Sequence, residues 1–232
     1  MVEKKGQLFD EWPEKYDRWF TTPIGSLVKK VESELMLDLL EPARREKILD
    51  AGCGSGVFTR DVLSSGVTVL GLDISLPMLL RSRNKAQGSA LHVLAGDLLN
   101  LPFPDHCFDK TVSVTALEFI ADGRRAVREL FRVTRKDGII VVATLNNLSP
   151  WASRRKEEAS KGHTLFQNVI FRSPDELASL APVKGIVRTA VHFLKEEDPN
   201  RAREIEQEGR RRALNTGAFL AARWKKPYRH FP

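Results

Sequence analysis

The sequence is poor in cysteine and contains no long apolar run. Its 232 residues include two cysteines, Cys53 and Cys107, which are too few for a disulfide framework or a four-ligand zinc site. No apolar stretch approaches the roughly 20 residues that cross a bilayer, and the N-terminus lacks the apolar segment of a signal peptide. These absences predict a cytoplasmic protein that has no membrane span and no metal site.

The composition is that of an ordinary globular protein with a basic C-terminal third. Hydrophobic residues make up 42% of the chain and charged residues 29%, which excludes a disordered chain. The formal net charge is +7, but residues 1–150 sum to zero, whereas residues 151–232 carry 17 Lys and Arg against 10 Asp and Glu. The pattern does not favour a nucleic-acid binder that is basic all over its surface, although it leaves a local anionic partner open.

From residue 47 onward, short apolar runs alternate with helical patterns, which is typical of βαβ units and a parallel sheet. The expected strands are 47–51, 68–74, 91–95, 109–115, 139–145, 185–193 and 217–224. The expected helices lie in 8–41, 57–65, 76–86, 123–134, a short stretch opened by Ser173 and Pro174, and 199–214. Residues 147–172 are expected to form a long connection, which in a compact domain usually serves a function.

A glycine-rich turn, ILDAGCGSG at 48–56, is the most informative segment. Gly52, Gly54 and Gly56 allow the backbone to approach a ligand closely, and the helix that follows offers free N–H groups. Neither the dinucleotide pattern G-x-G-x-x-G nor the P-loop pattern is present. A purely structural turn is the alternative to a ligand-binding one.

Acidic residues follow the next two expected strands. Asp73 ends the second strand, where a carboxylate beside the glycine-rich turn suits the two hydroxyls of a ribose. Asp97 ends the third strand, where it could accept a hydrogen bond from an exocyclic amine. One such Asp is more often a helix cap or a turn former, but two at successive strand ends favour a nucleoside site.

Four segments in this order resemble the class I S-adenosylmethionine (SAM) methyltransferases, in the branch called methyltransferase type 11. They are ILDAGCGSG at 48–56, GLDIS at 71–75 with Met78, GDLLNLPFPDHCFD at 96–109 and DGIIVV at 137–142. The resemblance implies a Rossmann-like α/β fold with helices on both faces of a seven-stranded, mostly parallel sheet. The implied strand order is 3-2-1-4-5-7-6, with the last strand antiparallel.

The resemblance also implies one domain over residues 1–232. Residues 1–46 would form a helical cap, residues 47–146 the cofactor-binding core, and residues 147–232 the acceptor-side lid and the last strands. The cofactor would be SAM, which is converted to S-adenosylhomocysteine.

By the same resemblance, cofactor contacts follow the strand ends. The three glycines lie along the methionine part of SAM, and Asp73 holds the ribose. Ile74 and Met78 flank the adenine. Tyr16 closes over the amino-acid end of SAM, although its helical spacing with Trp12, Trp19 and Phe20 leaves simple packing as the alternative. The full implied set is Tyr16, Asp50, Gly52, Gly54, Gly56, Asp73, Ile74, Met78, Asp97, Leu98 and Thr115.

Methyl transfer from a sulfonium requires alignment, exclusion of water and, for a poor nucleophile, a base. Glu118, beyond the fourth expected strand, and His163, in the long connection, are the candidate bases. A solvated carboxylate and an ordinary loop histidine are the respective alternatives.

The basic C-terminal third contains two groups of charges. Arg154 and Arg155, in the long connection, could hold a carboxylate or phosphate of the acceptor, with a solvated rim as the alternative. On the expected helix 199–214, the charges are expected to form a solvated face with pairs such as Glu206–Arg210 and Glu208–Arg212.

The sequence therefore predicts an enzyme that transfers the methyl group of SAM to a small or medium organic acceptor through O, N, S or C. The alternatives are a methyltransferase of RNA, ribosomal or other protein substrates, and a non-catalytic SAM-binding sensor or partner subunit. The residues after the fourth expected strand, 115–118 (TALE), do not form the [DNS]-P-P-[YFW] motif of nucleic-acid amino methylation. A nucleic-acid acceptor is thus not favoured, but it stays open.

Overall fold

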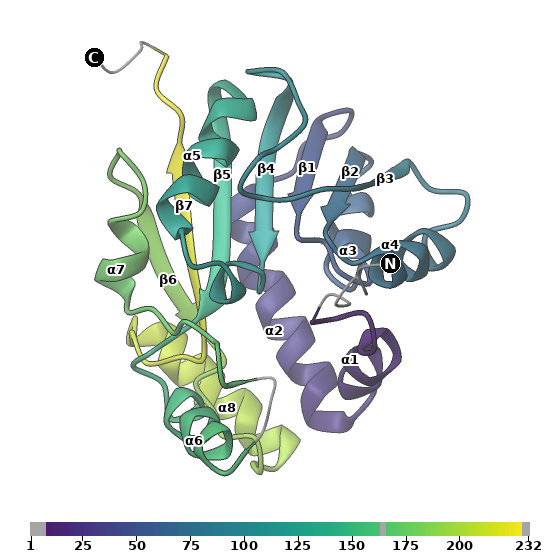
Figure 1. Cartoon of the computed structure of the whole chain (residues 1–232). Coiled ribbons are helices and arrows are strands. Elements are labelled where there is room, and N and C mark those ends of the chain that lie inside the picture. The colour runs from purple at the N-terminus through teal and green to yellow at the C-terminus, as the bar shows by residue number, and fades with distance from the viewer. Residues whose placement is uncertain (1–7, 163–165, 229–232) are drawn as a thin grey trace.

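A seven-stranded sheet organises the part of the chain that this computed structural model describes, residues 8–162 and 166–228 (Figure 1). The strands are β1 (Lys47–Ala51), β2 (Thr68–Asp73), β3 (Leu91–Ala95), β4 (Phe108–Val114), β5 (Thr134–Leu145), β6 (Ile186–Ala190) and β7 (Phe219–Lys225). Their order is β3-β2-β1-β4-β5-β7-β6, and β7 runs antiparallel to both of its neighbours. The expected order and the expected antiparallel last strand are confirmed.

Helices surround this sheet, and most of them begin at a proline. They are α1 (Pro13–Trp19), α2 (Pro23–Leu40), α3 (Thr59–Leu63), α4 (Leu76–Lys85), the 3₁₀ turn η1 (Leu117–Phe119), α5 (Gly123–Val133), α6 (Pro150–Ser160), α7 (Pro174–Ala178) and α8 (Pro199–Arg211). Proline suits the first helical position because its fixed φ is already helical and its missing N–H would have no partner there. None of these helices within the described residues is long and apolar enough to cross a membrane.

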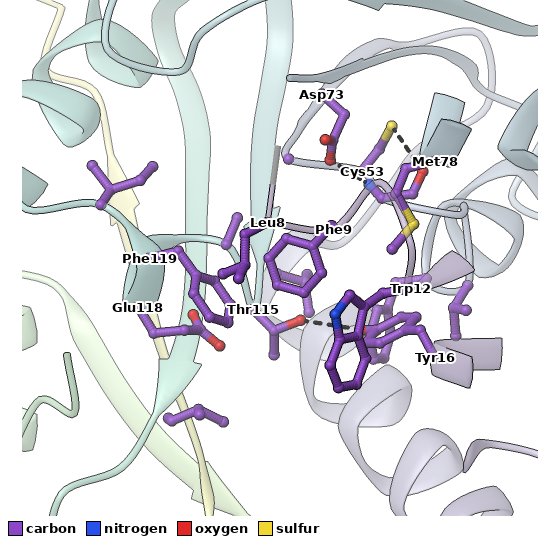
Figure 2. A pocket seen from close by; sticks show the side chains of 18 of the residues that line it. Leu8, Phe9, Trp12, Tyr16, Cys53, Asp73, Met78, Thr115, Glu118 and Phe119 are labelled. Carbon is purple, nitrogen blue, oxygen red and sulfur yellow. Dashed lines mark hydrogen bonds between the residues drawn. The ribbon is translucent and has the colours of Figure 1, made fainter. Parts of the chain in front are cut away.

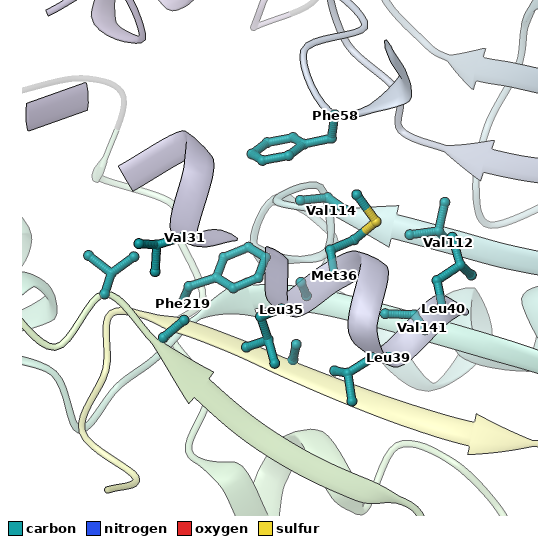
Figure 3. Close-up of a cluster of buried hydrophobic side chains, with 14 of the residues drawn as sticks. Val31, Leu35, Met36, Leu39, Leu40, Phe58, Val112, Val114, Val141 and Phe219 are labelled. Atoms are coloured by element: carbon teal, nitrogen blue, oxygen red, sulfur yellow. The ribbon is translucent and has the colours of Figure 1, made fainter. Parts of the chain in front are cut away.

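The hydrophobic core lies on both faces of the sheet because successive strand residues point to opposite sides. On one face, α2 packs with Met36 and Leu39 against strand residues such as Val141 (Figure 3). On the other face, α5 covers strand residues such as Leu49 with Leu130. Burial on both faces explains why the central strands are almost continuously apolar in sequence.

The expectation of one long connection over residues 147–172, with the next helix opened by Ser173, is wrong in its first half. Residues 150–160 form α6, whose N-cap Ser149 accepts a hydrogen bond from the backbone N–H of Ala152 at 3.1 Å. Ser149-Pro150 is the same helix-start signal as Ser173-Pro174, which opens α7 as expected. The polar outer face of α6 hides the apolar period, so the helix was missed.

The charged pairs on α8 agree only in part with the expectation. Glu206 accepts from Arg210 at 2.8 Å, as predicted, whereas Glu208 pairs with Arg211 at 2.6 Å instead of with Arg212. Glu206 is buried and also accepts from the backbone N–H of His192 at 2.8 Å. This side of α8 therefore packs on the domain and is not a solvated face.

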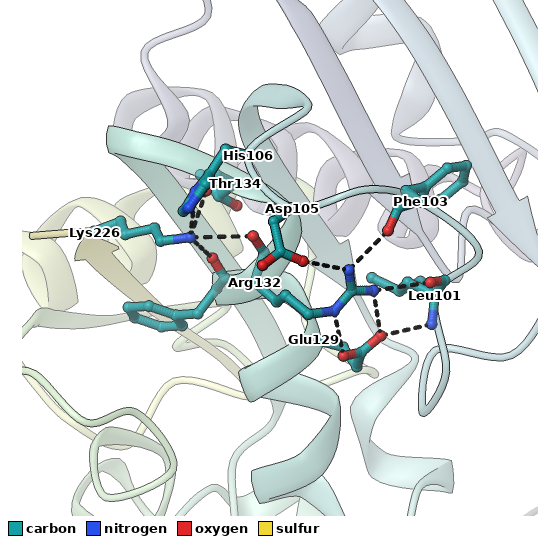
Figure 4. A network of polar contacts seen from close by, with 9 residues as sticks. Leu101, Phe103, Asp105, His106, Glu129, Arg132, Thr134 and Lys226 are labelled. Atoms are coloured by element: carbon teal, nitrogen blue, oxygen red, sulfur yellow. Dashed lines mark hydrogen bonds and ion pairs between the residues drawn. The ribbon is translucent and has the colours of Figure 1, made fainter. Parts of the chain in front are cut away.

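A polar network joins Lys226, which follows β7, to Arg132 near the end of α5 (Figure 4). It lies at the end of the sheet opposite the carboxyl ends of the parallel strands. Arg132 pairs with Glu129 at 2.7 Å and with Asp105 at 2.9 Å. Lys226 donates to the carbonyl oxygen of Thr134 at 2.7 Å. The Lys226 contact joins the end of β7 to the start of β5, and the Arg132–Asp105 pair joins α5 to the loop before β4.

Candidate functional site

A cavity of about 800 Å³ lies at the carboxyl ends of the parallel strands. Its walls come from the turns after β1, β2, β3 and β4, from α1 and α2, and from α6. In Figure 1, α1 and α6 lie at the end of the sheet toward which β4 points. This is the place where open α/β sheets bind ligands.

The glycine-rich turn opens onto this cavity. Gly54 has φ +52°, and a Cβ added there would meet nothing within 4 Å, so the backbone is bare toward the cavity. Gly52, at φ +80°, must also be glycine because a Cβ would lie 2.4 Å from the Cβ of Ala116. A Cβ on Gly56 would lie 2.4 Å from the Oγ of Ser82 in α4. Gly56 therefore serves the packing of the turn and does not line the cavity.

Asp50 lies beneath the turn and does not line the cavity either. The hydroxyl of Thr59 donates to its Oδ2 at 2.6 Å. Burial raises the pKa of Asp50 to about 6, against the lowering effect of this hydrogen bond. Asp50 thus joins the end of β1 to the start of α3, which supports the turn from below.

Asp73 connects the ends of β1 and β2. Its Oδ2 accepts from the backbone N–H of Gly54 at 2.8 Å, and its Oδ1 accepts from that of Ser75 at 2.9 Å. Burial raises its pKa, and these backbone hydrogen bonds oppose the shift. Ile74 and Met78 line the cavity beside it, and the side chain of Ile74 is 53% exposed. A carboxylate beside a free apolar surface fits a ribose and a flat base.

The turn after β3 adds Asp97 and Leu98 to the same end of the cavity. Asp97 accepts from the backbone N–H of Leu99 at 2.8 Å, and Leu98 is buried. The structure therefore brings together nine of the eleven residues in the implied cofactor set, with Asp50 and Gly56 behind them.

The N-terminal segment covers the cavity between its two ends. Figure 2 shows Phe9 in the space between Asp73 and Glu118, with Trp12 and Tyr16 to one side of it. The hydroxyl of Tyr16 lies 3.4 Å from the Oγ1 of Thr115, and burial raises the pKa of Tyr16. Thr115 has φ +50°, a left-handed conformation that is uncommon for this residue and often marks functional sites.

Asp17 holds α1 on the glycine-rich turn. It accepts from the hydroxyl of Ser55 at 2.6 Å and from Lys85 at 2.9 Å, and it also pairs with Arg81. Although burial raises the pKa of Asp17, the hydrogen bonds from these three side chains lower it below the ordinary value of 3.8. Ion pairs from Asp17 to Arg81 and Lys85 therefore hold α1, which covers the cavity, against α4.

Glu118 lies at the inner end of the cavity and is 1% exposed, so it is not a solvated carboxylate. The hydroxyl of Thr144 donates to its Oε2 at 3.2 Å. Arg172 holds η1 in place by donating to the carbonyl oxygen of Leu117 at 3.0 Å. Burial raises the pKa of Glu118 to about 7, while Thr144 and the charge of Arg155 oppose the shift. The other candidate base, His163, lies outside the described residues.

Arg154 and Arg155 both line the cavity but lie in different surroundings. Arg154 is at the rim, where it pairs with Glu158 at 3.0 Å and with Glu196. The guanidinium of Arg155 lies over the ring of Trp151, 5.2 Å from its centroid. Burial lowers the pKa of Arg155, and the charges of the nearby carboxylates oppose this shift.

Glu32 of α2 is a buried ionisable residue of the cavity that the sequence did not indicate. It is 9% exposed and lines the inner end of the cavity. Burial raises its pKa to about 8, the charge of Arg155 opposes the shift, and that of Glu118 adds to it. In the sequence, Glu32 can be recognised as an acidic residue on the buried face of an amphipathic helix, which it shares with Val28, Val31 and Leu35.

Comparison with known proteins agrees with this geometry. The model of a methyltransferase domain family matches residues 49–142. The malonyl-[acyl-carrier protein] O-methyltransferase of Pectobacterium atrosepticum is 32% identical over 187 residues, which cover 71% of this chain and 73% of that protein. The demethylmenaquinone methyltransferase of Corynebacterium kroppenstedtii is 33% identical over 145 residues, which cover 61% of each protein.

A solved structure shares the fold. It is that of a SAM-dependent methyltransferase from Thermotoga maritima, described as a possible histamine N-methyltransferase. The TM-score is 0.71 at 23% sequence identity, and the match covers 94% of this chain and 97% of the other.

The Asp17 anchor leads to a prediction about the cap. In Asp17→Asn, loss of the charge-assisted contacts to Arg81 and Lys85 should raise amide hydrogen exchange in α1 about tenfold. Because its pKa is depressed, this anchoring is complete above pH 3.8 and is lost as the pH falls below that value. Glu14→Gln on the same helix is the control, because the 78% exposed Glu14 side chain lies 3.9 Å from Arg81 and so exposed a pair contributes little; this variant should raise exchange far less. Equal exchange in the two variants would contradict the assignment.

Proposed function

The chain belongs to the class I SAM-dependent methyltransferases of the type 11 branch, and we propose that its acceptor is a small organic molecule held at the inner end of the cavity. The observation that carries the proposal is one continuous cavity that runs from the glycine-rich turn to Glu118. The names of two relatives, which specify malonyl-[acyl-carrier protein] and demethylmenaquinone, support an organic acceptor group, which in the first of them is carried on a protein.

The outer end of the cavity fits SAM. Asp73 would hold the ribose, Ile74 and Met78 would flank the adenine, and the bare backbone at Gly54 leaves room for the methionine part. Asp97 would meet the edge of the base. When bound, SAM supplies a methyl group on a positively charged sulfur. The chain's own contribution is to orient this group and to exclude water.

Asp50 and Gly56 act indirectly in this proposal. Asp50 supports the turn through Thr59, and Gly56 allows the turn to pack on α4. Their substitution would therefore disturb cofactor binding through the shape of the turn.

Glu118 is the general base for an acceptor that must lose a proton. A base works best when its pKa is near the working pH, and the buried Glu118 has a pKa of about 7. Thr144 orients the carboxylate by donating to it, and Arg172 holds η1, the turn that carries Glu118. A proton taken from the acceptor would reside on an Oε atom of Glu118 until solvent removes it.

The helices that cover the acceptor end of the cavity, α1 and α6, favour a small acceptor and disfavour a macromolecular one. The acceptor end lies under α1 and α6, and Trp19 of α1 meets Trp151 of α6 with ring centroids 6.4 Å apart. An RNA or protein chain would need an open groove there. The position of α1 and α6 over the acceptor end thus favours a molecule small enough to fit beneath these two helices.

Cofactor binding should depend on Asp73. Asp73→Ala removes a charged acceptor for the ribose hydroxyls and the anchor of Gly54, so the Kd for SAM should rise about 10- to 100-fold. Isothermal titration calorimetry measures this directly. Asp38→Ala, which removes an exposed partner of Arg188 far from the cavity, should bind SAM as the wild type does. If the wild type fails to bind SAM, the proposed function is wrong.

The role of Glu118 predicts a pH dependence. The wild-type kcat should rise as the pH increases through about 7, because Glu118 is a base only after it has lost its proton. Glu118→Gln should lower kcat about 100-fold or more and should not show this rise. Glu204→Gln, at an exposed position of α8, serves as the control. A Glu118→Gln variant with unchanged kcat and an unchanged pH profile would refute a base role.

A further inference from the structure

The inner end of the cavity contains two buried carboxylates that lack a cationic partner. Glu32 comes from α2 and Glu118 from η1, and the two are 9% and 1% exposed. Within residues 8–162 and 166–228, no Lys, Arg or His nitrogen lies within 4.0 Å of either carboxylate. Buried charges are normally paired because leaving water is costly. This site is therefore built to receive positive charge or hydrogen-bond donors.

The nearby arginines do not meet this demand. The guanidinium of Arg155 lies over the rings of Trp151 and Phe166, at 5.2 and 5.5 Å from their centroids. Its charge acts on Glu32 and Glu118 without forming a contact pair. Arg154 already pairs with carboxylates at the rim.

An anionic acceptor would meet unfavourable charges here. A carboxylate or phosphate placed at Arg155 would lie in the field of two buried carboxylates, in a largely apolar cavity where charges interact strongly. A protonated amine would instead supply the missing cationic partner of both glutamates. The surrounding wall, which includes Trp19, Trp151 and Phe119, suits an apolar body attached to that amine.

We propose that the acceptor is a primary or secondary amine with an apolar body, whose protonated nitrogen is bound by the carboxylates of Glu32 and Glu118. This inference rests on the proposed methyltransferase function and specifies its substrate class. Glu32 binds the ammonium group, whose positive charge favours the ionised form of this carboxyl against its raised pKa of about 8, whereas Glu118 takes the proton.

The reaction balances with these two residues. One N–H proton passes from the ammonium group to Glu118, which frees the lone pair of the nitrogen. That lone pair forms the new N–C bond as the bond between the methyl carbon and sulfur breaks, and the electron pair of the broken bond stays on sulfur. The products are a methylated ammonium ion and S-adenosylhomocysteine, and Glu118 returns its proton to solvent.

A matched acceptor panel tests the substrate class. Purified enzyme with SAM is offered alkyl and arylalkyl amines, together with carboxylic acids, phenols and thiols of the same carbon skeletons, and the release of S-adenosylhomocysteine is measured. We expect turnover with members of the amine series. Turnover confined to acids, phenols or thiols, or none with any amine by an enzyme that binds SAM, would overturn the inference.

The Glu32→Gln variant tests the residue, with Glu34→Gln as its control. Glu34 is on the same helix, but its side chain is 45% exposed and pairs with Lys30 and Arg210. For the best amine, Glu32→Gln should raise KM about tenfold or more, with a smaller change in kcat, because one charged contact is lost. Glu34→Gln should leave both constants unchanged.

A binding measurement tests the amine preference without relying on turnover. Calorimetry compares phenethylamine with 3-phenylpropanoate on the enzyme saturated with S-adenosylhomocysteine. The amine should bind at least about tenfold more tightly, and Glu32→Gln should abolish this preference. A preference for the carboxylate, or an amine affinity that Glu32→Gln leaves unchanged, would refute the inference.

The two proposals fail in different ways. If the wild type binds neither SAM nor S-adenosylhomocysteine, the proposed function itself is wrong. If both bind but amines are neither bound nor methylated, only the amine assignment is wrong.

Discussion

The hydrogen bond from the backbone N–H of Gly54 to Asp73, at 2.8 Å, is the contact on which the site depends. It joins the turn after β1 to the end of β2, two strands that pair in parallel with Asp50 beside Gly71. The turn can come this close only because its glycines adopt positive φ angles. A single carboxylate therefore both shapes the bare turn and faces the cavity.

Charge divides the cavity into two ends with different chemistry. The outer end has an anchored carboxylate and free apolar surface, whereas the inner end has Glu32 and Glu118 buried without a contact cation in the described part of the chain. Thr115, in its left-handed backbone conformation, lies between these two ends of the cavity. Its hydroxyl contacts that of Tyr16 in α1. Because the net charge of +7 resides mostly in exposed groups of residues 151–232, it says little about this acidic interior.

Nine of the residues that the sequence indicated for the cofactor line the cavity, as does Glu118, whereas Glu32 at the inner end was not indicated. The turn glycines and Asp73 have local signals, because the backbone conformation itself demands glycine and a strand end demands a polar partner. The signal at Glu32 is weaker, an acidic residue on the buried face of α2, and its place in the cavity arises only when α2 packs against the sheet. Likewise, α6 was missed because its polar outer face conceals a helix that Ser149 and Pro150 begin, and Glu208 pairs with Arg211 because side-chain rotamers, not spacing alone, select the partner.

A crystal structure of the enzyme with S-adenosylhomocysteine tests the central claim most directly, since the claim concerns the division of one cavity. We expect the ribose hydroxyls within about 3.2 Å of the Asp73 carboxylate and the sulfur directed past Thr115 toward Glu118 and Glu32. An adenosyl group bound away from Asp73, or a sulfur directed away from the two glutamates, would contradict the account.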